Sequence, residues 1–182
     1  MDVIRMRRAV RDFTGNAVGR AWIEQFISAA ILAPSAFNRQ PWAFAVVTDR
    51  RRIDTYGDRA RVWSLENVAE AGFGEEAREY LEKPDFNIFY HAPALVIVMA
   101  RFPDRQATED CCLAAENLLL AARDRGIGTC WIGFARPWLN LPETKEELGI
   151  PRDYQIVAPI VLGHPKSRPG SQGRIQPEIH WL

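Results

Sequence analysis

The sequence predicts an α+β fold with a mixed central β-sheet flanked by helices. Two continuous apolar runs, residues 94–100 and 155–163, are typical of strands that are covered on both faces. A long segment, residues 108–125, is apolar around much of its circumference and has the length of a buried helix. The order of the predicted elements, helix, strand, helices, strand, long helix, strand, strand, gives an α+β arrangement.

The first part of the chain is expected to contain two helices and a strand. Asp2 stands where a negative charge favours the start of a short helix, at residues 2–8. Residues 20–32 carry an apolar stripe at helical spacing, which is more typical of a core-facing helix than of an interface. A strand is expected at residues 44–47.

Residues 50–84 are polar and give the weakest pattern in the sequence. We expect short helices here, at residues 51–56, 62–71 and 75–82, separated by turns at Gly57, Gly72 and Gly74. The pattern is equally typical of a surface insert and of a cover for a bound ligand or partner.

The long helix at residues 108–125 is expected to begin with Thr108 as its N-cap and to end at Gly126. Its apolar side chains, Leu118 and Leu119 among them, predict burial either at the centre of the chain or at an oligomer interface. A strand should follow it, and then a short helix at residues 142–148 that ends at Gly149.

Size and charge limit the classes of function. A chain of 182 residues is expected to form a single domain, residues 1–182, with room for a real core. It has 23 basic and 23 acidic residues, so no overall field favours nucleic acid or an anionic membrane. No apolar run is long enough to span a bilayer, and no signal-peptide core follows the N-terminal arginines. We therefore expect a cytoplasmic protein without nucleic-acid or membrane partners.

The residues that bind metals or act as acids and bases are sparse. Cys111, Cys112 and Cys130 form one adjacent pair without a Cys-x-x-Cys motif, which argues against a disulfide framework or a zinc site. His91 is expected to be structural, because no carboxylate or cysteine is placed in the sequence to partner it. We expect no metal, and a Rossmann nucleotide site is disfavoured because no Gly-x-Gly-x-x-Gly follows a strand.

A proline-bounded polar loop lies between the second helix and the first strand. Pro34 and Pro41 stop helix formation and stiffen the segment. Between them, Ser35, Asn38 and Gln40 offer both hydrogen-bond donors and acceptors. Such a loop suits a flat ligand rich in heteroatoms, although a plain helix-to-strand connector has the same composition.

A cluster of arginines stands near the N-terminus. On a helix, Arg7 and Arg11 are four residues apart and share a face, with Arg8 close by. Like charges on one face invite an anion between them, and phosphate is the natural candidate for guanidinium groups. A solvated basic turn is the alternative interpretation.

These segments together resemble the FMN-dependent nitroreductase family, from Arg7 to Arg174. Ala-Pro-Ser-Ala-x-Asn-x-Gln-Pro-Trp is similar to the family's signature loop, and Arg-Arg-Ala-Val-Arg resembles the Arg-Arg-Ser-x-Arg that holds the FMN phosphate. Gly-Thr-Cys-Trp-Ile-Gly-Phe at residues 128–134 and the Gly-His-Pro turn at residues 163–165 are further similarities. The departure is Ala9, where serine is usual.

The resemblance implies which residues bind the cofactor. The arginines near the N-terminus, together with Arg174, correspond to phosphate ligands, and Arg168 is a weaker candidate for that role. The backbone of Ile132 and Gly133 corresponds to the segment beside the flavin N5. The full set implied for FMN is Arg7, Arg8, Ala9, Arg11, Pro34, Ser35, Ala36, Asn38, Gln40, Trp131, Ile132, Gly133 and Arg174.

The resemblance also implies a homodimer with two FMN sites at the subunit interface, and NADH or NADPH as the electron donor. In alternating half-reactions the donor reduces FMN and leaves, and a nitroaromatic, quinone or other conjugated electrophile enters the same pocket. No protein residue is assigned as catalytic, since the flavin carries the redox chemistry. A flavin storage or sensing protein without turnover, or dehalogenase or flavin-breakdown chemistry on the same fold, remains open.

Overall fold

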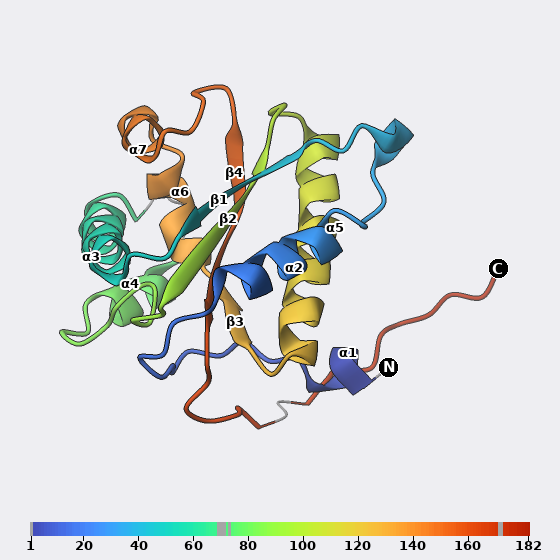
Figure 1. Ribbon diagram of the computed structural model, residues 1–182, viewed down its shortest axis with the longest axis horizontal. Coiled ribbons are helices and arrows are strands. Elements are labelled where there is room, and N and C mark those ends of the chain that lie inside the picture. The colour runs from blue at the N-terminus through green and yellow to red at the C-terminus, as the bar shows by residue number, and fades with distance from the viewer. Residues whose placement is uncertain (1, 69–71, 73, 171–172) are drawn as a thin grey trace.

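The computed structural model describes residues 2–68, 72, 74–170 and 173–182 of the chain (Figure 1). Its centre is one four-stranded sheet in the order β1-β2-β4-β3. The strands are β1 (Trp42–Val47), β2 (Ala94–Ala100), β3 (Gly128–Trp131) and β4 (Gln155–Gly163). All strand pairings are antiparallel. The prediction of a mixed sheet is therefore wrong for these strands, and the parallel pairing is an isolated bridge between Ala9 and Thr129.

Helices cover both faces of the sheet, as predicted. On one face lie α2 (Arg20–Ala30) and α5 (Arg105–Asp124), and on the other lie α3 (Arg50–Glu66) and α6 (Arg136–Leu139) (Figure 1). Every residue of β2 is buried, as its continuous apolar sequence indicated. Two hydrophobic clusters result, one under each helical layer.

The long helix α5 begins earlier than predicted. Its N-cap is Asp104, whose carboxylate accepts a hydrogen bond from the Ala107 N–H at 2.6 Å. Thr108 lies inside the first turns, so the prediction that it caps the helix is wrong. Leu118 and Leu119 are buried in the core of the chain itself. The apolar circumference of α5 is thus explained by packing against α2 and the sheet, without a partner subunit.

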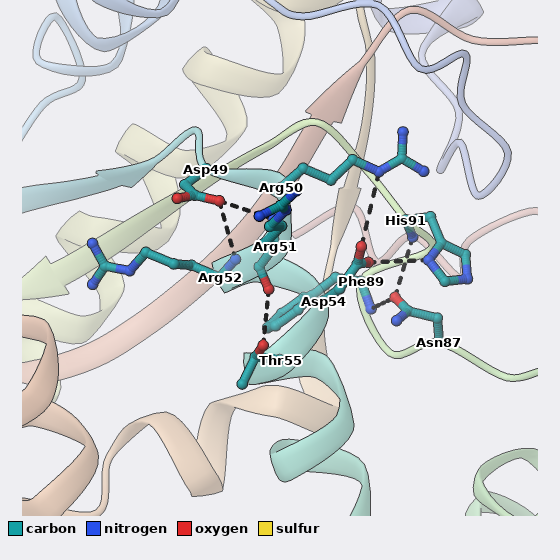
Figure 2. Close-up of polar contacts among 9 residues, drawn as sticks. All are labelled: Asp49, Arg50, Arg51, Arg52, Asp54, Thr55, Asn87, Phe89 and His91. Carbon is teal, nitrogen blue, oxygen red and sulfur yellow. Dashed lines mark hydrogen bonds and ion pairs between the residues drawn. The ribbon is translucent and has the colours of Figure 1, made fainter.

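The helix α3 is continuous where the sequence suggested separate pieces. Asp49 caps it by accepting hydrogen bonds from the backbone of Arg51 at 2.9 Å and of Arg52 at 3.3 Å (Figure 2). Gly57 lies within the helix and not in a turn, and a Cβ there would come within 3.2 Å of the Asn87 side chain. The predicted helix at 62–71 continues beyond the end of α3 into residues 69–71, which lie outside the described residues.

The remaining elements are short. They are α1 (Asp2–Met6), α4 (Glu75–Leu81), α7 (Pro142–Leu148), and the 3-10 helices η1 (Ala36–Asn38) and η2 (Gly133–Ala135). Helix α7 matches its prediction, and Gly149 ends it with φ at 69°. Among the described residues after β4 there is an isolated bridge at Pro165 but no helix or strand, and the C-terminus lies beyond α1 (Figure 1). No helix in the described part of the chain combines the length and apolarity needed to cross a bilayer.

Candidate functional site

The N-terminal arginine segment is fixed along the edge strand β3. The Val10 N–H donates to the Thr129 carbonyl at 2.9 Å, next to the parallel bridge between Ala9 and Thr129. The approach is close enough that a Cβ on Gly128 would lie 2.9 Å from Val10. Segments that are more than a hundred residues apart in sequence thereby meet, and the arginines come to lie beside β3.

The arginines surround a hollow, although not from the helical face that the sequence suggested. Helix α1 ends at Met6, so Arg7 and Arg11 follow it outside any helix. A hollow of about 210 Å³ is lined by Arg7, Arg8, Ala9, Arg11, Pro169, Gly170 and Arg174. Arg168 instead lines an adjoining hollow of about 270 Å³, together with Arg7 and Arg8.

Within this cluster, Arg7 and Arg8 differ in how their side-chain nitrogens are paired. Arg7 pairs through Nε with Glu116 at 3.2 Å. One terminal nitrogen of Arg8 donates to the carbonyls of Arg5 and Arg7, each at 2.7 Å. The Nε of Arg8 is buried and has no hydrogen-bond partner within the described residues. A buried N–H without an acceptor is costly, and an anionic oxygen supplies that acceptor.

A second hollow of about 210 Å³ adjoins the first and shares Arg11 with it. The Ile132 N–H donates to the Pro159 carbonyl at 2.8 Å. Ile132 and Gly133 are the two residues whose backbone was expected beside the flavin N5. Of their N–H groups, that of Gly133 has no acceptor among the described residues. A Cβ on Gly133 would meet nothing within 4 Å, so the backbone there is open. The second hollow is lined by Arg11, Ile88, Tyr90, Trp131, Ile132, Gly133 and Phe134.

Two neutral groups lie beside the Arg11 guanidinium. Burial raises the pKa of the Tyr90 phenol above its ordinary value, and the charge of Arg11 opposes that shift. Burial likewise raises the pKa of the Cys130 thiol, again against the charge of Arg11. Both groups therefore stay protonated at neutral pH and leave the positive charge of Arg11 in place.

The predicted proline-bounded loop is held at the other end of α5. The Ala36 N–H donates to both carboxylate oxygens of the buried Asp110, at 3.2 and 3.3 Å. Within the loop, the Gln40 N–H donates to the Ser35 hydroxyl, and the Gln40 side chain donates to the Asn38 side chain, both at 3.0 Å. The polar groups that the sequence singled out thus largely satisfy one another.

Three residues of this loop have left-handed backbone conformations. Phe37, Asn38 and Gln40 have φ values of 52°, 54° and 47°. Such conformations are uncommon for residues with a Cβ and are found at functional sites more often than elsewhere. The strained loop is exposed, and Phe37 is 97% accessible.

The single chain therefore brings together only part of the predicted set. Arg7, Arg8, Ala9, Arg11 and Arg174 join Trp131, Ile132 and Gly133 around two adjoining hollows. The predicted loop residues, Pro34, Ser35, Ala36, Asn38 and Gln40, line neither of these hollows. In Figure 1 the loop and α1 lie near opposite ends of α5.

Sequence reasoning missed several neighbours of the site. Tyr90 lines the second hollow, and the available signal was its place just before the buried strand β2. Asp110 holds the loop, although no sequence pattern assigned it to the site. His91 was expected to have no carboxylate partner, yet its Nδ1 lies 3.0 Å from Asp54 (Figure 2). Asp54 belongs to α3, so only the tertiary fold makes this pair.

The two hollows define a class of site. A cluster of arginines with an unpaired buried N–H, within the described part of the chain, fits a terminal anion such as a phosphate. The adjoining hollow, walled by Tyr90, Trp131 and Phe134 and opened by Gly133, fits a flat ring at the other end of the same ligand. Both requirements are met by a phosphorylated ring cofactor.

Comparisons with known proteins agree with this class. The family model described as the nitroreductase family matches residues 4–164. A protein of Archaeoglobus fulgidus that is named as an NADH dehydrogenase/NAD(P)H nitroreductase is 33% identical over 172 residues, which are 91% of this chain and 85% of that protein.

Solved structures give the same result. A nitroreductase with bound FMN from Bacteroides fragilis superposes with a TM-score of 0.85 at 24% identity, over 100% of this chain and 97% of that chain. A Desulfovibrio desulfuricans protein, described as a nitroreductase in complex with FMN, gives a TM-score of 0.69 at 26% identity, over 96% and 90% of the two chains. The chain belongs to the nitroreductase family, and its predicted nitroreductase-like α+β fold is confirmed.

Proposed function

We propose that residues 1–182 form a single FMN-binding domain of an oxidoreductase that uses NADH or NADPH. The observation that carries this proposal is the pair of adjoining hollows, one lined by arginines and one opened by Gly133, which share Arg11. The names of its relatives support the same activity, since they mention FMN and NAD(P)H. FMN, when bound, supplies the redox chemistry by taking electrons from the nicotinamide and passing them to an acceptor.

The protein's own residues bind and orient the cofactor. Arg7, Arg8 and Arg174 hold the phosphate, and the Nε of Arg8 gains the acceptor that it lacks within the described residues. The Gly133 N–H is offered to the ring from an open stretch of backbone. Arg11, between the two hollows, favours a ligand that becomes more negative, because its charge acts in a partly dry site.

The acceptor is a nitroaromatic, a quinone or a related conjugated electrophile, taken up by a ping-pong mechanism. The aromatic wall of Tyr90, Trp131 and Phe134 supports flat acceptors. In this mechanism the nicotinamide and the acceptor use the same face of the ring in turn, so the donor leaves before the acceptor enters.

The active form is a homodimer in which the loop of one chain completes the site of the other. The loop lines neither hollow of its own chain, yet it is strained and well anchored by Asp110. Leu32 and Phe37 expose 80% and 97% of their surfaces beside it. A second copy of the chain would cover these apolar side chains.

Stopped-flow absorbance tests the function directly. The purified protein should be yellow and release FMN, not FAD, since a single terminal phosphate suits the cluster of Arg7, Arg8 and Arg174. Mixing with NADH or NADPH should bleach the flavin rapidly, and a quinone or nitroaromatic should restore the colour. A protein that binds FMN but is not bleached would be a storage or sensing protein, and a protein that binds no FMN would refute the proposal altogether.

A further inference from the structure

The loop that leads into β2 has an unusual backbone. Tyr90 and His91 are consecutive, neither is glycine, and their φ values are 54° and 52°. A left-handed conformation brings the Cβ of such residues close to the following carbonyl and is unfavourable. Two in succession persist only where the surroundings hold them in place.

A polar cluster holds this loop (Figure 2). The buried side chain of Asn87 accepts hydrogen bonds through Oδ1 from the N–H of Phe89 at 2.9 Å and from the N–H of His91 at 3.1 Å. His91 also contacts Asp54 of α3 at 3.0 Å, and the other oxygen of Asp54 lies 3.9 Å from Arg50 Nε. These contacts hold the loop together and attach it to α3. They also fix the orientation of the residue that lies between Phe89 and His91.

That residue is Tyr90, whose side chain enters the wall of the second hollow. Its ring packs edge-to-face on Phe86, with centroids 5.8 Å apart. The guanidinium carbon of Arg11 lies 6.0 Å from the centroid of the Tyr90 ring, and the charge of Arg11 opposes the rise in the pKa of the phenol. Tyr90 is thus the contact that links the strained loop to Arg11.

The contact is distinctive because it leaves the arginine charged. Arg7, four residues earlier, is paired with the carboxylate of Glu116. Within the described ranges, no carboxylate lies at ion-pair distance from Arg11, whose polar neighbours are the neutral Tyr90 phenol and Cys130 thiol. A carboxylate in the place of Tyr90 would orient the guanidinium equally well but would cancel its charge.

We propose that Tyr90 is a positioning residue that holds the Arg11 guanidinium between the two hollows without neutralising it. This inference rests on the proposed binding of FMN at that site. A fixed positive charge beside the ring favours the more negative, reduced form of the cofactor and so raises its reduction potential. Tyr90 therefore sets the reduction potential of bound FMN through Arg11.

The test is Tyr90→Phe, which keeps the ring and its packing but removes the phenol oxygen. We expect FMN to bind roughly threefold to tenfold more weakly, the range expected when one polar contact at the site is lost. The midpoint potential of the bound flavin should shift to more negative values. The matched control is Tyr56→Phe, which removes a phenol that accepts a hydrogen bond from Arg52 at 2.8 Å, and neither residue lines the two hollows. That control should leave both quantities unchanged.

A double-mutant cycle separates positioning from a direct contact with FMN. If Tyr90 acts through Arg11, Tyr90→Phe should have no further effect on potential or affinity in an Arg11→Ala background. An equal effect in both backgrounds, or a wild-type potential in the single variant, would overturn the positioning role of Tyr90 but leave the proposed function standing. A wild-type protein that binds no FMN would refute the proposed function itself, and this inference with it.

Discussion

The two halves of the predicted cofactor site are held in different ways. The arginine half is assembled by backbone pairing, since the segment after α1 lies along β3 and meets the chain beyond β4. The loop half is held by one buried carboxylate, Asp110, near the N-terminal end of α5 (Figure 1). The resemblance assigned both halves to a site at the subunit interface, and a single chain brings together only the residues of the arginine half.

The halves also differ in what they lack. In the arginine half, Arg8 keeps a buried N–H without an acceptor in the part of the chain described. In the loop half, Ser35 and Asn38 already accept hydrogen bonds from Gln40. The arginine half therefore needs an anion to complete its hydrogen bonds. The loop half already makes its hydrogen bonds within the loop, but it lies too far along α5 to line either hollow of its own chain. This difference supports binding of the phosphate by one chain and completion of the ring site by another.

The largest effect should come from separating the two halves. Leu32→Arg places a charge on an exposed leucine beside the loop, where a second copy is proposed to pack. Dimer content and FMN content should fall together, because a ligand that binds only the dimer is lost with it. Light scattering and flavin absorbance on the same column fractions measure both quantities.

The control for this variant is Val62→Arg, a similar change at an exposed valine of α3. It should leave the dimer and its flavin intact. A monomer peak of Leu32→Arg that carries a full complement of FMN would rule out a shared site. The two buried leucines, Leu118 and Leu119, are unsuitable for this test, because a charge there would disrupt the core of the single chain.

The next effect tests the arginine half alone. Arg7→Ala and Arg174→Ala each remove a charge-assisted contact with the phosphate, worth about 1.5–3 kcal/mol. FMN affinity should fall by about tenfold or more in each variant. Arg105→Ala, which removes an exposed arginine paired with Glu109, is the matched control. Titration of the apoproteins with FMN measures the change. Wild-type affinity in both variants would mean that these arginines are solvated surface residues that do not bind the phosphate.

Much of the fold could be predicted because it depends on local patterns. The apolar run of β4 and the helix ended by Gly149 match their predicted bounds. Pairing direction depends on how strands meet in space, which no local pattern encodes, so the mixed sheet was wrong. Gly57 was misread as a turn because the close approach of Asn87, which favours glycine there, comes from a distant segment.

The candidate site shows the same limit. The arginines and Gly133 could be found by resemblance, because their motifs are contiguous in sequence. Tyr90 and Asp110 could not, since each acts through a residue far away in the chain, Arg11 or Ala36. The Ile132 N–H was assigned to the ligand although it donates to the Pro159 carbonyl of β4. Hydrogen-bond competition of this kind becomes visible only in three dimensions.

A smaller effect tests the anchor of the loop half. Asp110→Ala removes both acceptors of the Ala36 N–H and should loosen the strained loop. FMN affinity should fall roughly threefold to tenfold, because the loop is then less well fixed for the other chain. Glu109→Ala, at the exposed neighbouring residue, is the control and should bind FMN normally. Unchanged affinity in Asp110→Ala would mean that the loop does not depend on this carboxylate.

A last comparison concerns two buried thiols, one in each half, and is read from stability instead of from FMN binding. Burial raises the pKa of Cys111 to about 12, and the neighbouring Cys112 and Asp110 contribute to the same shift. Burial also raises the pKa of Cys130 in the arginine half, but there the charge of Arg11 opposes the shift. A buried thiol therefore has a negative neighbour, Asp110, in the loop half and a positive neighbour, Arg11, in the arginine half.

The sign of the resulting pH dependence follows from the direction of these shifts. In the unfolded chain a thiol loses its proton near pH ~8.5, whereas folded Cys111 keeps its proton up to about pH 12. Between these values the unfolded state binds fewer protons, so the free energy of unfolding falls as the pH rises. Cys111→Ser should remove this loss, about 2 kcal/mol at pH ~10, and Cys130→Ser should remove less. Urea unfolding at about pH 7 and about pH 10 measures both changes, and an alkaline loss in Cys111→Ser equal to that of the wild type would contradict the assignment.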